Sequence, residues 1–555
     1  MTTPAPTEFP GPPVRPSVLR TFVTVDGIGT RWPAAIRAAA AFALPASVLL
    51  AAGLGRTALL AALGGFAVLY GENRPYRIRW RVILTAGLAL VVSAGTLGAL
   101  SHLAGATPST AASIGLVVAT VALSAVVVFV GNALRIGPPG PFFLVLTGGV
   151  ALSVVRHGVD PLEVVAVTAA GVVGALVAGM APALVRRRAP EAAAVAAATK
   201  SVEAYLDAGA SRASHLRQGA GGALLQAWSV LHDAAQVDGP LARRLWEAHH
   251  RVHTGANPDP DDPAAMAPLP RPSIAHRLRS AMHVDSPAAV ATLRVTVAAT
   301  VAGVVSVLCG LSRPDWAIVA VVLVLQLGPD RIRGALRGAH RLVGTAVGVG
   351  LFALIHHLAP SPAVLVVLLT VLTFLIELTV VSNYGLAVMA ITPLALSMSA
   401  SGPAIATPAL DRILETVIGV AVGIGALWVV APHAHRRTIR FTRAGTLAAM
   451  TRLLDTVATA PPASPAGMER RRDVQWALME AELAAGVAAV DEPAFAHHDW
   501  PRHVRLRATV HELLGLCWRH GSTPPAPDDE EIRTVRSAVA DLSADAMLSP
   551  SAGRG

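Results

Sequence analysis

The stretch RPYRIRWRVILTAGLALVVSAGTLGAL, Arg74–Leu100, decides the class of fold. Its first eight residues carry four arginines, and the nineteen residues that follow carry no charge. An apolar run of about 20 residues is long enough to cross a bilayer as a helix. Arginines at one end of such a run are typical of its cytoplasmic side. The stretch therefore predicts a membrane protein and one cytoplasmic loop.

Composition extends this prediction to the whole chain. Of 555 residues, 53% are hydrophobic and 14% are charged, and the mean hydropathy is +0.55. Soluble proteins carry about 25% charged residues. The formal net charge is +10, but the basic clusters flank apolar runs and no zinc-finger or RNA-binding motif occurs, so no nucleic-acid partner is expected.

Twelve apolar segments follow one another along the chain, several of them shorter than a straight span requires. They cover residues 34–52, 58–71, 82–103, 110–131, 141–155 and 162–185, and then 288–311, 316–328, 342–356, 363–381, 384–400 and 413–430. Arginine-rich connections, such as RPYRIRWR and RIRGALRGAHR, alternate with arginine-poor ones. This alternation predicts twelve spans with both termini in the cytoplasm.

The two sets of six segments resemble each other. A shift of 260 residues aligns Arg77 with Arg337 and Arg81 with Arg341. Because each set has an even number of spans, both begin on the same side of the membrane, so the repeats would be parallel. Between and after the sets lie polar regions with amphipathic helical patterns.

The sequence thus predicts an all-α polytopic membrane protein with two six-helix parallel repeats and cytoplasmic helical domains. Its regions would be a disordered N-terminal tail (1–30), a first transmembrane block (31–185), a cytoplasmic helical domain with a Pro-rich linker (186–285), a second transmembrane block (286–432) and a cytoplasmic C-terminal helical domain (433–555).

The paired basic loops are the strongest binding candidates. On a helix, Arg77 and Arg81 share a face, as do Arg337 and Arg341. Arginine binds carboxylates and phosphates through two parallel hydrogen bonds, so these four residues predict an anion-attracting cytoplasmic vestibule. The alternative is that the arginines only set topology and contact lipid headgroups.

Among acidic residues, Glu377 lies deepest in a predicted span. A charge at the bilayer centre costs about 2.5–3.5 kcal/mol, so it faces a cavity or a partner. Glu377 is therefore a candidate for proton coupling or gating, or else a structural partner of a buried arginine or hydroxyl. Glu163, Asp411 and Glu415 are expected to be solvated at span ends. Asp315 would cap its helix or pair with Arg313.

The sequence gives no sign of an enzyme. The single lysine, Lys200, is not part of a phosphate-binding loop, so the chain is not a P-loop ATPase by itself. No G-x-S-x-G or H-E-x-x-H motif occurs, and Cys309 and Cys517 form neither a metal motif nor a disulfide framework. We expect no catalytic residues, no metal and no cofactor.

The second set of segments resembles the fusaric acid resistance protein-like (FUSC) family of the aromatic acid exporter superfamily. The resemblance rests on Trp316-Ala317, on the last span ETVIGVAVGIGAL, and on a motif formed by Arg341, Gly344, Thr345 and Gly348. In the first half Leu84 replaces the glycine of this motif. The resemblance implies a bacterial inner-membrane exporter of aromatic or other organic acids, and it extends to the aluminium-activated malate channels of plants.

Three functions remain open on these grounds. The leading one is secondary efflux of small organic anions such as aromatic carboxylates across the bacterial plasma membrane. The alternatives are a passive anion channel and a non-transporting membrane scaffold for envelope or secretion partners. A homodimer is compatible with the sequence, which contains no feature that requires one.

Overall fold

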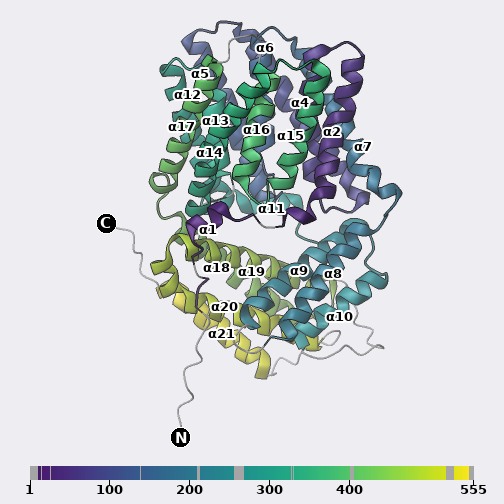
Figure 1. Cartoon of the computed structure of the whole chain (residues 1–555). Coiled ribbons are helices and arrows are strands. Elements are labelled where there is room, and N and C mark those ends of the chain that lie inside the picture. The colour runs from purple at the N-terminus through teal and green to yellow at the C-terminus, as the bar shows by residue number, and fades with distance from the viewer. Residues whose placement is uncertain are drawn as a thin grey trace. The chain divides into compact units, whose positions relative to one another are not determined.

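The computed structural model describes residues 11–548, apart from residues 14, 26, 138, 209–212, 255–267, 327, 329, 400–405 and 521–529. All regular elements in these described stretches are helices, which confirms the all-α class. The chain forms two compact units (Figure 1). We call Pro16–Arg187 with Leu278–Pro432 the membrane unit, and residues 188–277 with His433–Gly555 the polar unit, which also includes Met1–Arg15.

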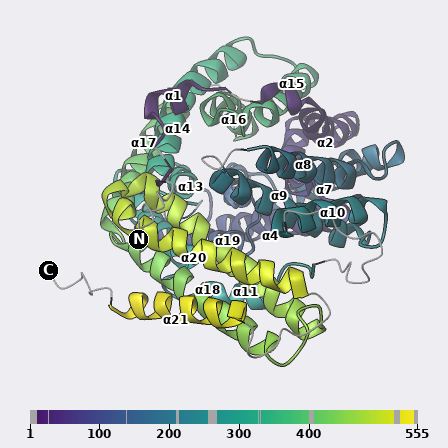
Figure 2. The same ribbon diagram turned by 90° about the horizontal axis from the view of Figure 1, so that it is seen from below.

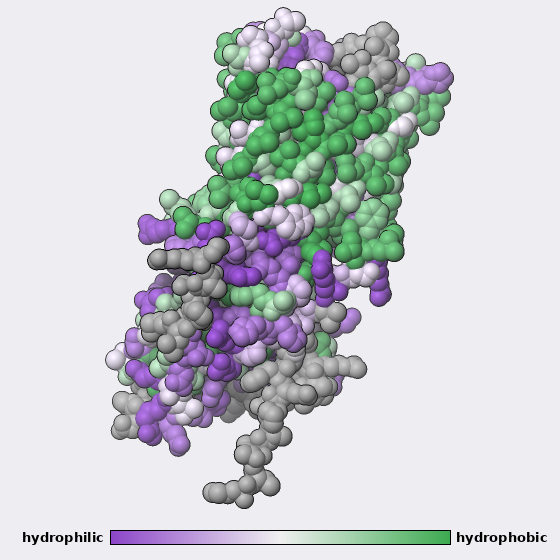
Figure 3. Space-filling view, turned by 90° about the vertical axis from the view of Figure 1, so that its left-hand side faces the viewer, coloured by the Kyte–Doolittle hydropathy of each residue, from purple (hydrophilic) through white to green (hydrophobic). Residues whose placement is uncertain are grey.

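Within its described residues, the membrane unit contains eight helices that are long and apolar enough to cross a bilayer. They are α2 (Trp32–Ala51), α4 (Tyr76–Ala104), α5 (Thr110–Ala133), α7 (Pro161–Met180), α12 (Pro287–Leu308), α14 (Arg331–His357), α15 (Pro362–Thr379) and α17 (Ala406–Val429). These helices carry many exposed Val and Leu side chains, and Figure 3 shows hydrophobic residues gathered in one broad band. A broad exposed apolar surface on helices of this length is typical of membrane proteins, so the prediction of a membrane protein is confirmed.

The described part of the membrane unit also contains four shorter apolar helical segments. They are the run Gly55–Gly71, which includes α3 (Ala61–Gly65), and the helices α6 (Phe142–Arg156), α13 (Pro314–Leu325) and α16 (Tyr384–Ser399). Each of the twelve predicted apolar segments overlaps one of these twelve elements. In α13, every residue from Trp316 to Leu325 is at most 2% exposed. A helix that is apolar all round is buried on all sides, which explains the uniform composition of α13.

Glycines allow the helices to approach closely where the site is built. A Cβ atom on Gly344 of α14 would lie 2.7 Å from the Gly385 carbonyl oxygen of α16, and one on Gly419 of α17 would lie 2.3 Å from the Ala317 carbonyl oxygen of α13. Small residues at such crossings are typical of membrane helices. The glycines of the family-like motif therefore pack α14 against α16.

The polar unit consists of further helices, which Figure 2 shows from below. They are α8 (Ala189–Leu206), α9 (Ala213–Ala234), α10 (Pro240–Thr254), α18 (Ala434–Val457), α19 (Pro465–Asp491), α20 (Pro493–His520) and α21 (Glu530–Leu548). A further helix, α11 (Ile274–Ala281), contains the boundary between the two units. One core of the polar unit is built around Trp228 and Trp246, and another around Leu453 and Leu513. Most of the predicted Pro-rich linker lies outside the described residues.

The predicted disordered tail requires a correction. Residues Val18–Val23 form helix α1, and the Phe22 ring stacks on His340 with ring centroids 4.4 Å apart. The Phe22 carbonyl accepts a hydrogen bond from Asn383 Nδ2 at 3.0 Å. His340 of α14 and the side chain of Asn383 thus contact part of a segment whose composition is typical of disorder. Residues 1–10 lie outside the described part of the chain.

Candidate functional site

The four predicted vestibule arginines occupy different environments. Arg77 and Arg81 are exposed on α4, and the Arg81 guanidinium lies 5.3 Å from the centre of the Trp80 ring. Arg337 is partly buried on α14, while Arg341, one turn further on, is fully buried. The alignment of the two halves therefore does not extend to the burial of these side chains.

A second buried arginine faces Arg341 from another helix. Arg412 of α17 is fully buried, and Arg341 is among its closest charged neighbours. The Arg412 guanidinium stacks 3.4 Å from the centre of the Trp316 ring, and that of Arg341 lies 5.9 Å from the Phe142 ring. We call Arg341 and Arg412 the arginine pair.

The arginine pair is uncompensated by hydrogen bonds. All three guanidinium nitrogens of each residue are buried, and none has a hydrogen-bond partner among the described residues. The Tyr384 hydroxyl lies within loose hydrogen-bonding range of Arg341, and the Thr345 hydroxyl lies one turn further along α14. Within the described structure neither hydroxyl forms a hydrogen bond of standard geometry. Buried polar groups are normally paired, so an unpartnered cluster calls for a functional explanation.

Sequence reasoning missed Arg412 because it placed the start of the last apolar segment at Ile413. Helix α17 begins at Ala406 instead, so Arg412 and Glu415 lie inside the helix. The available signal was their i, i+3 spacing just before an apolar run, which places a cation and a carboxylate on neighbouring positions of one helix.

Next to the arginine pair lies a cluster of charges on α13 and α17. Arg313 donates two hydrogen bonds to the Asp315 carboxylate, at 3.0 and 2.8 Å, and one to the Gly149 carbonyl at 3.2 Å. The Arg313 backbone amide donates to Glu415 Oε1 at 2.7 Å. Of the two roles predicted for Asp315, the structure shows the pairing with Arg313.

The position of Glu415 is a correction. We expected its carboxylate to be solvated, but Glu415 is fully buried. The physical reason is the earlier start of α17, which carries Glu415 past the loop and against α13, where Gly419 permits close contact between the two backbones.

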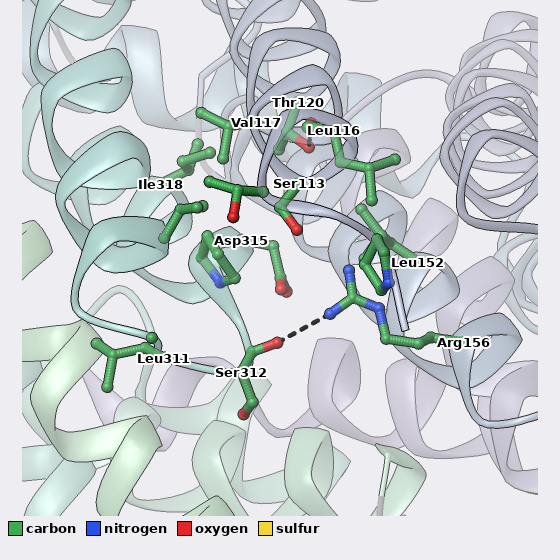
Figure 4. A pocket seen from close by; sticks show the side chains of 15 residues that line it. Ser113, Leu116, Val117, Thr120, Leu152, Arg156, Leu311, Ser312, Asp315 and Ile318 are labelled. Atoms are coloured by element: carbon green, nitrogen blue, oxygen red, sulfur yellow. Dashed lines mark hydrogen bonds between the residues drawn. The ribbon is translucent and has the colours of Figure 1, made fainter. Parts of the chain in front are cut away.

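A pocket opens beside this charged cluster (Figure 4). Its volume is about 230 Å³, and its walls combine apolar side chains such as Leu116, Leu152 and Ile318 with Arg156 and Asp315. Arg156 Nη1 donates to the Ser312 carbonyl at 3.0 Å. Figure 4 shows the Arg156 guanidinium and the Asp315 carboxylate directed into the same space, so the charged cluster is accessible from this pocket.

Glu377 has a partner in the structure. It is 4% exposed on α15, and Arg31 forms an ion pair with its carboxylate. Arg31 Nε also donates to the Glu377 carbonyl at 3.2 Å. The structure thus shows Glu377 paired with an arginine, which was one of its two predicted roles. The role of Glu377 in proton coupling or gating stays a prediction.

Two further observations bear on the chemistry of the site. Asn132 Nδ2 donates to the Gln326 carbonyl at 2.8 Å, which joins α5 to the end of α13. In the part of the chain that the structure describes, no group of three or more His, Cys, Asp or Glu side chains could hold a metal ion. The buried guanidinium groups of the arginine pair suit the binding of an anion.

A comparison with known protein families gives a match for part of the chain. Residues 297–426 match the family model described as fusaric acid resistance protein-like, which confirms the predicted resemblance for this part of the chain. The matched segment contains Trp316, Arg341, Tyr384, Arg412 and Glu415. No curated protein and no solved structure matches the sequence. The family match and the apolar helices together indicate a multi-pass membrane protein of transporter type.

Proposed function

We propose that the protein exports small organic anions, aromatic carboxylates among them, across the bacterial plasma membrane. The observation that carries this proposal is the arginine pair: two fully buried guanidinium groups, neither hydrogen-bonded within the described structure. A carboxylate between them would receive charge-assisted hydrogen bonds from both. Such a ligand would also lower the cost of holding two like charges away from water.

The aromatic rings around the arginine pair suit an aromatic substrate. Trp316 already stacks on Arg412, and Phe142 lies near Arg341. Rings pack favourably against rings and against guanidinium planes. A planar carboxylate with an apolar body would therefore find both of its parts complemented.

The proposal includes the topology inferred from sequence. All twelve apolar helical elements would cross or enter the membrane as two parallel repeats, with both termini and the polar unit in the cytoplasm. Arg77, Arg81 and Arg337 would then attract anions at the cytoplasmic entrance, and Arg341 would receive them one turn deeper. A membrane potential that is negative inside favours anion exit by about 2.3 kcal/mol per charge per 100 mV.

A passive anion channel is the second candidate function. It is favoured by the presence of basic residues at both the pocket, where Arg156 lies, and the arginine pair. Electrical recording from planar bilayers discriminates between the two functions. Large currents that depend only on the anion gradient and voltage support a channel, whereas slow saturable flux supports a carrier.

The proposal is tested by measuring the transport of radiolabelled benzoate in inside-out vesicles, where export from the cytoplasmic face is seen as uptake into the vesicle. Replacing Arg412 by Gln removes one guanidinium but keeps hydrogen-bonding capacity, and we expect flux to fall at least about tenfold. The matched control is Arg333→Gln, because Arg333 is an exposed arginine at the start of α14. Equal flux in both variants, at equal membrane insertion, would contradict the proposal.

A further inference from the structure

Glu415 is a buried carboxylate whose two oxygens have different environments. Oε1 accepts the hydrogen bond from the Arg313 amide at 2.7 Å. Oε2 is buried and has no hydrogen-bond partner among the residues that the structure describes. An unpaired buried oxygen on an ionised carboxylate is costly, whereas a protonated oxygen could act as a donor toward a neighbouring acceptor.

The charged groups that face Glu415 come from the N-terminal end of α13 and from α17. Arg313 and Asp315 are contributed by α13, and Arg412 precedes Glu415 by one turn on α17 itself. Asp411, also on α17, accepts hydrogen bonds from Ser312 instead. On α14, Arg341 is the charge that faces Arg412.

The remaining charges near this cluster are engaged elsewhere or lie beyond Asp315. Arg156 of α6 lies across the pocket from Asp315. Arg294, the one charged residue of α12, donates to carbonyls near the opposite end of α17. Arg313 compensates Asp315 with two hydrogen bonds, and Asp411 is bound to Ser312, so Glu415 is left as the carboxylate that interacts most strongly with Arg412.

We propose that Glu415 is a proton-binding site and that its ionised carboxylate competes with the transported anion for Arg412. The inference rests on the proposed function of the arginine pair. While Glu415 is ionised, it partly neutralises Arg412. When an organic carboxylate binds Arg412, two negative charges share one guanidinium, and a like charge nearby favours protonation. A proton from water then forms an O–H bond with Glu415 Oε2, and it returns to water when the anion leaves.

The pocket provides the route for this proton. Asp315 lines the pocket and shares Arg313 with Glu415, so water at Asp315 comes close to the buried carboxylate. Carboxylates that link a water-filled space to a binding site are typical of proton relays in membrane proteins. The consequence is that anion and proton bind together, and lower pH strengthens anion binding.

The experiment follows from the expected rise in anion affinity as the pH falls. Binding of benzoate and of benzenesulfonate to the purified full-length protein is measured between about pH 5.5 and about pH 8.5, where both probes stay ionised, since a free carboxyl titrates near pH 4. We expect wild-type affinity for both probes to be at least about tenfold higher at the acidic end. Glu415→Gln should bind tightly at all pH values, and Asp411→Asn, one turn away, should keep the wild-type slope.

A second measurement does not depend on any variant folding. Binding to the wild-type protein in weakly buffered solution, followed with a pH indicator, should take up protons. Affinity that does not change with pH, a pH slope that persists in Glu415→Gln, or proton release on binding would each overturn this inference while leaving the proposed function intact. Failure of both probes to bind at any pH would overturn the proposed function and this inference together.

Discussion

The two halves of the membrane unit place the same arginine spacing at different depths. Helix α4 begins at Tyr76, so Arg81 lies five residues into it; α14 begins at Arg331, so Arg341 lies ten residues in. At 1.5 Å per residue these depths are about 7.5 and 15 Å. Arg81 is exposed and Arg341 is fully buried. The same arginine spacing in the two halves therefore does not imply the same environment for the aligned side chains.

The buried arginines of the membrane unit also differ in whether they form hydrogen bonds. In the first half, Arg79 donates to the carbonyls of Arg74, at 3.1 Å, and Gly179, at 3.4 Å. In the second half, Arg294 donates to the carbonyls of Val430, Leu427 and Ala431. Hydrogen bonds of this kind hold helix ends together. Arg341 and Arg412 lack such bonds within the described structure, which separates arginines that stabilise the fold from arginines that could receive a ligand.

The largest expected effect tests the two equivalent positions directly. Arg341→Gln should lower benzoate efflux about a hundredfold, because it removes charge-assisted bonds worth about 1.5–3 kcal/mol. Arg81→Gln should change efflux by less than about twofold, since exposed charges contribute little. Flux through proteoliposomes of matched protein content measures both. A larger loss in Arg81→Gln would reverse the comparison.

The next effect concerns the glycine that the halves do not share. Gly344→Leu introduces the side chain found at Leu84, and its Cβ would lie 2.7 Å from the Gly385 carbonyl oxygen. We expect α14 and α16 to separate, with a loss of about 3 kcal/mol in stability. Thermal unfolding in detergent measures this loss. The reciprocal Leu84→Gly should cost only about 1 kcal/mol, so an equal cost for the two variants would contradict the close packing of α14.

Replacing the two kinds of buried arginine by Met should change the stability of the protein in different directions. Arg294→Met leaves three carbonyls without a donor and should destabilise the protein by about 2 kcal/mol while keeping flux per folded molecule. Arg341→Met removes an uncompensated charge and should be neutral or stabilising while abolishing flux. The comparison breaks if both variants shift the unfolding temperature in the same direction.

The smallest effect extends the comparison to the polar unit. Burial raises the pKa of Glu482 to about 7, opposed by Arg507 and by a hydrogen bond from Gln218. Because the folded pKa is above the unfolded value, the folded state holds this proton more tightly, so stability is lost as pH rises from about 4.5 through about 7. We expect Glu482→Gln to remove about 1 kcal/mol of this pH dependence, measured by tryptophan fluorescence during unfolding. An unchanged pH dependence would show that Glu482 ionises freely.

Much of the site could not be predicted from sequence. Arg341 was identified from the R-x-x-x-R spacing and the Gly-Thr motif, but its partner Arg412 was excluded by an apolar boundary drawn at Ile413. Glu415 lies inside that predicted segment, but it was assigned to solvent because it is close to the outer end of the segment. Both errors arise because polar residues at a helix start look like loop residues until another helix covers them.

The sequence by itself determined the all-helical membrane class, the approximate positions of the apolar helices and the resemblance of residues 297–426 to a known family. These properties depend on local features: the length of an apolar run, its flanking arginines and a short glycine motif. Only the tertiary structure decided which arginines are buried without partners and that Arg313, Asp315, Arg412 and Glu415 meet. Burial depends on which helices pack together across 100 residues of chain, and the sequence spacing within one helix does not contain that information.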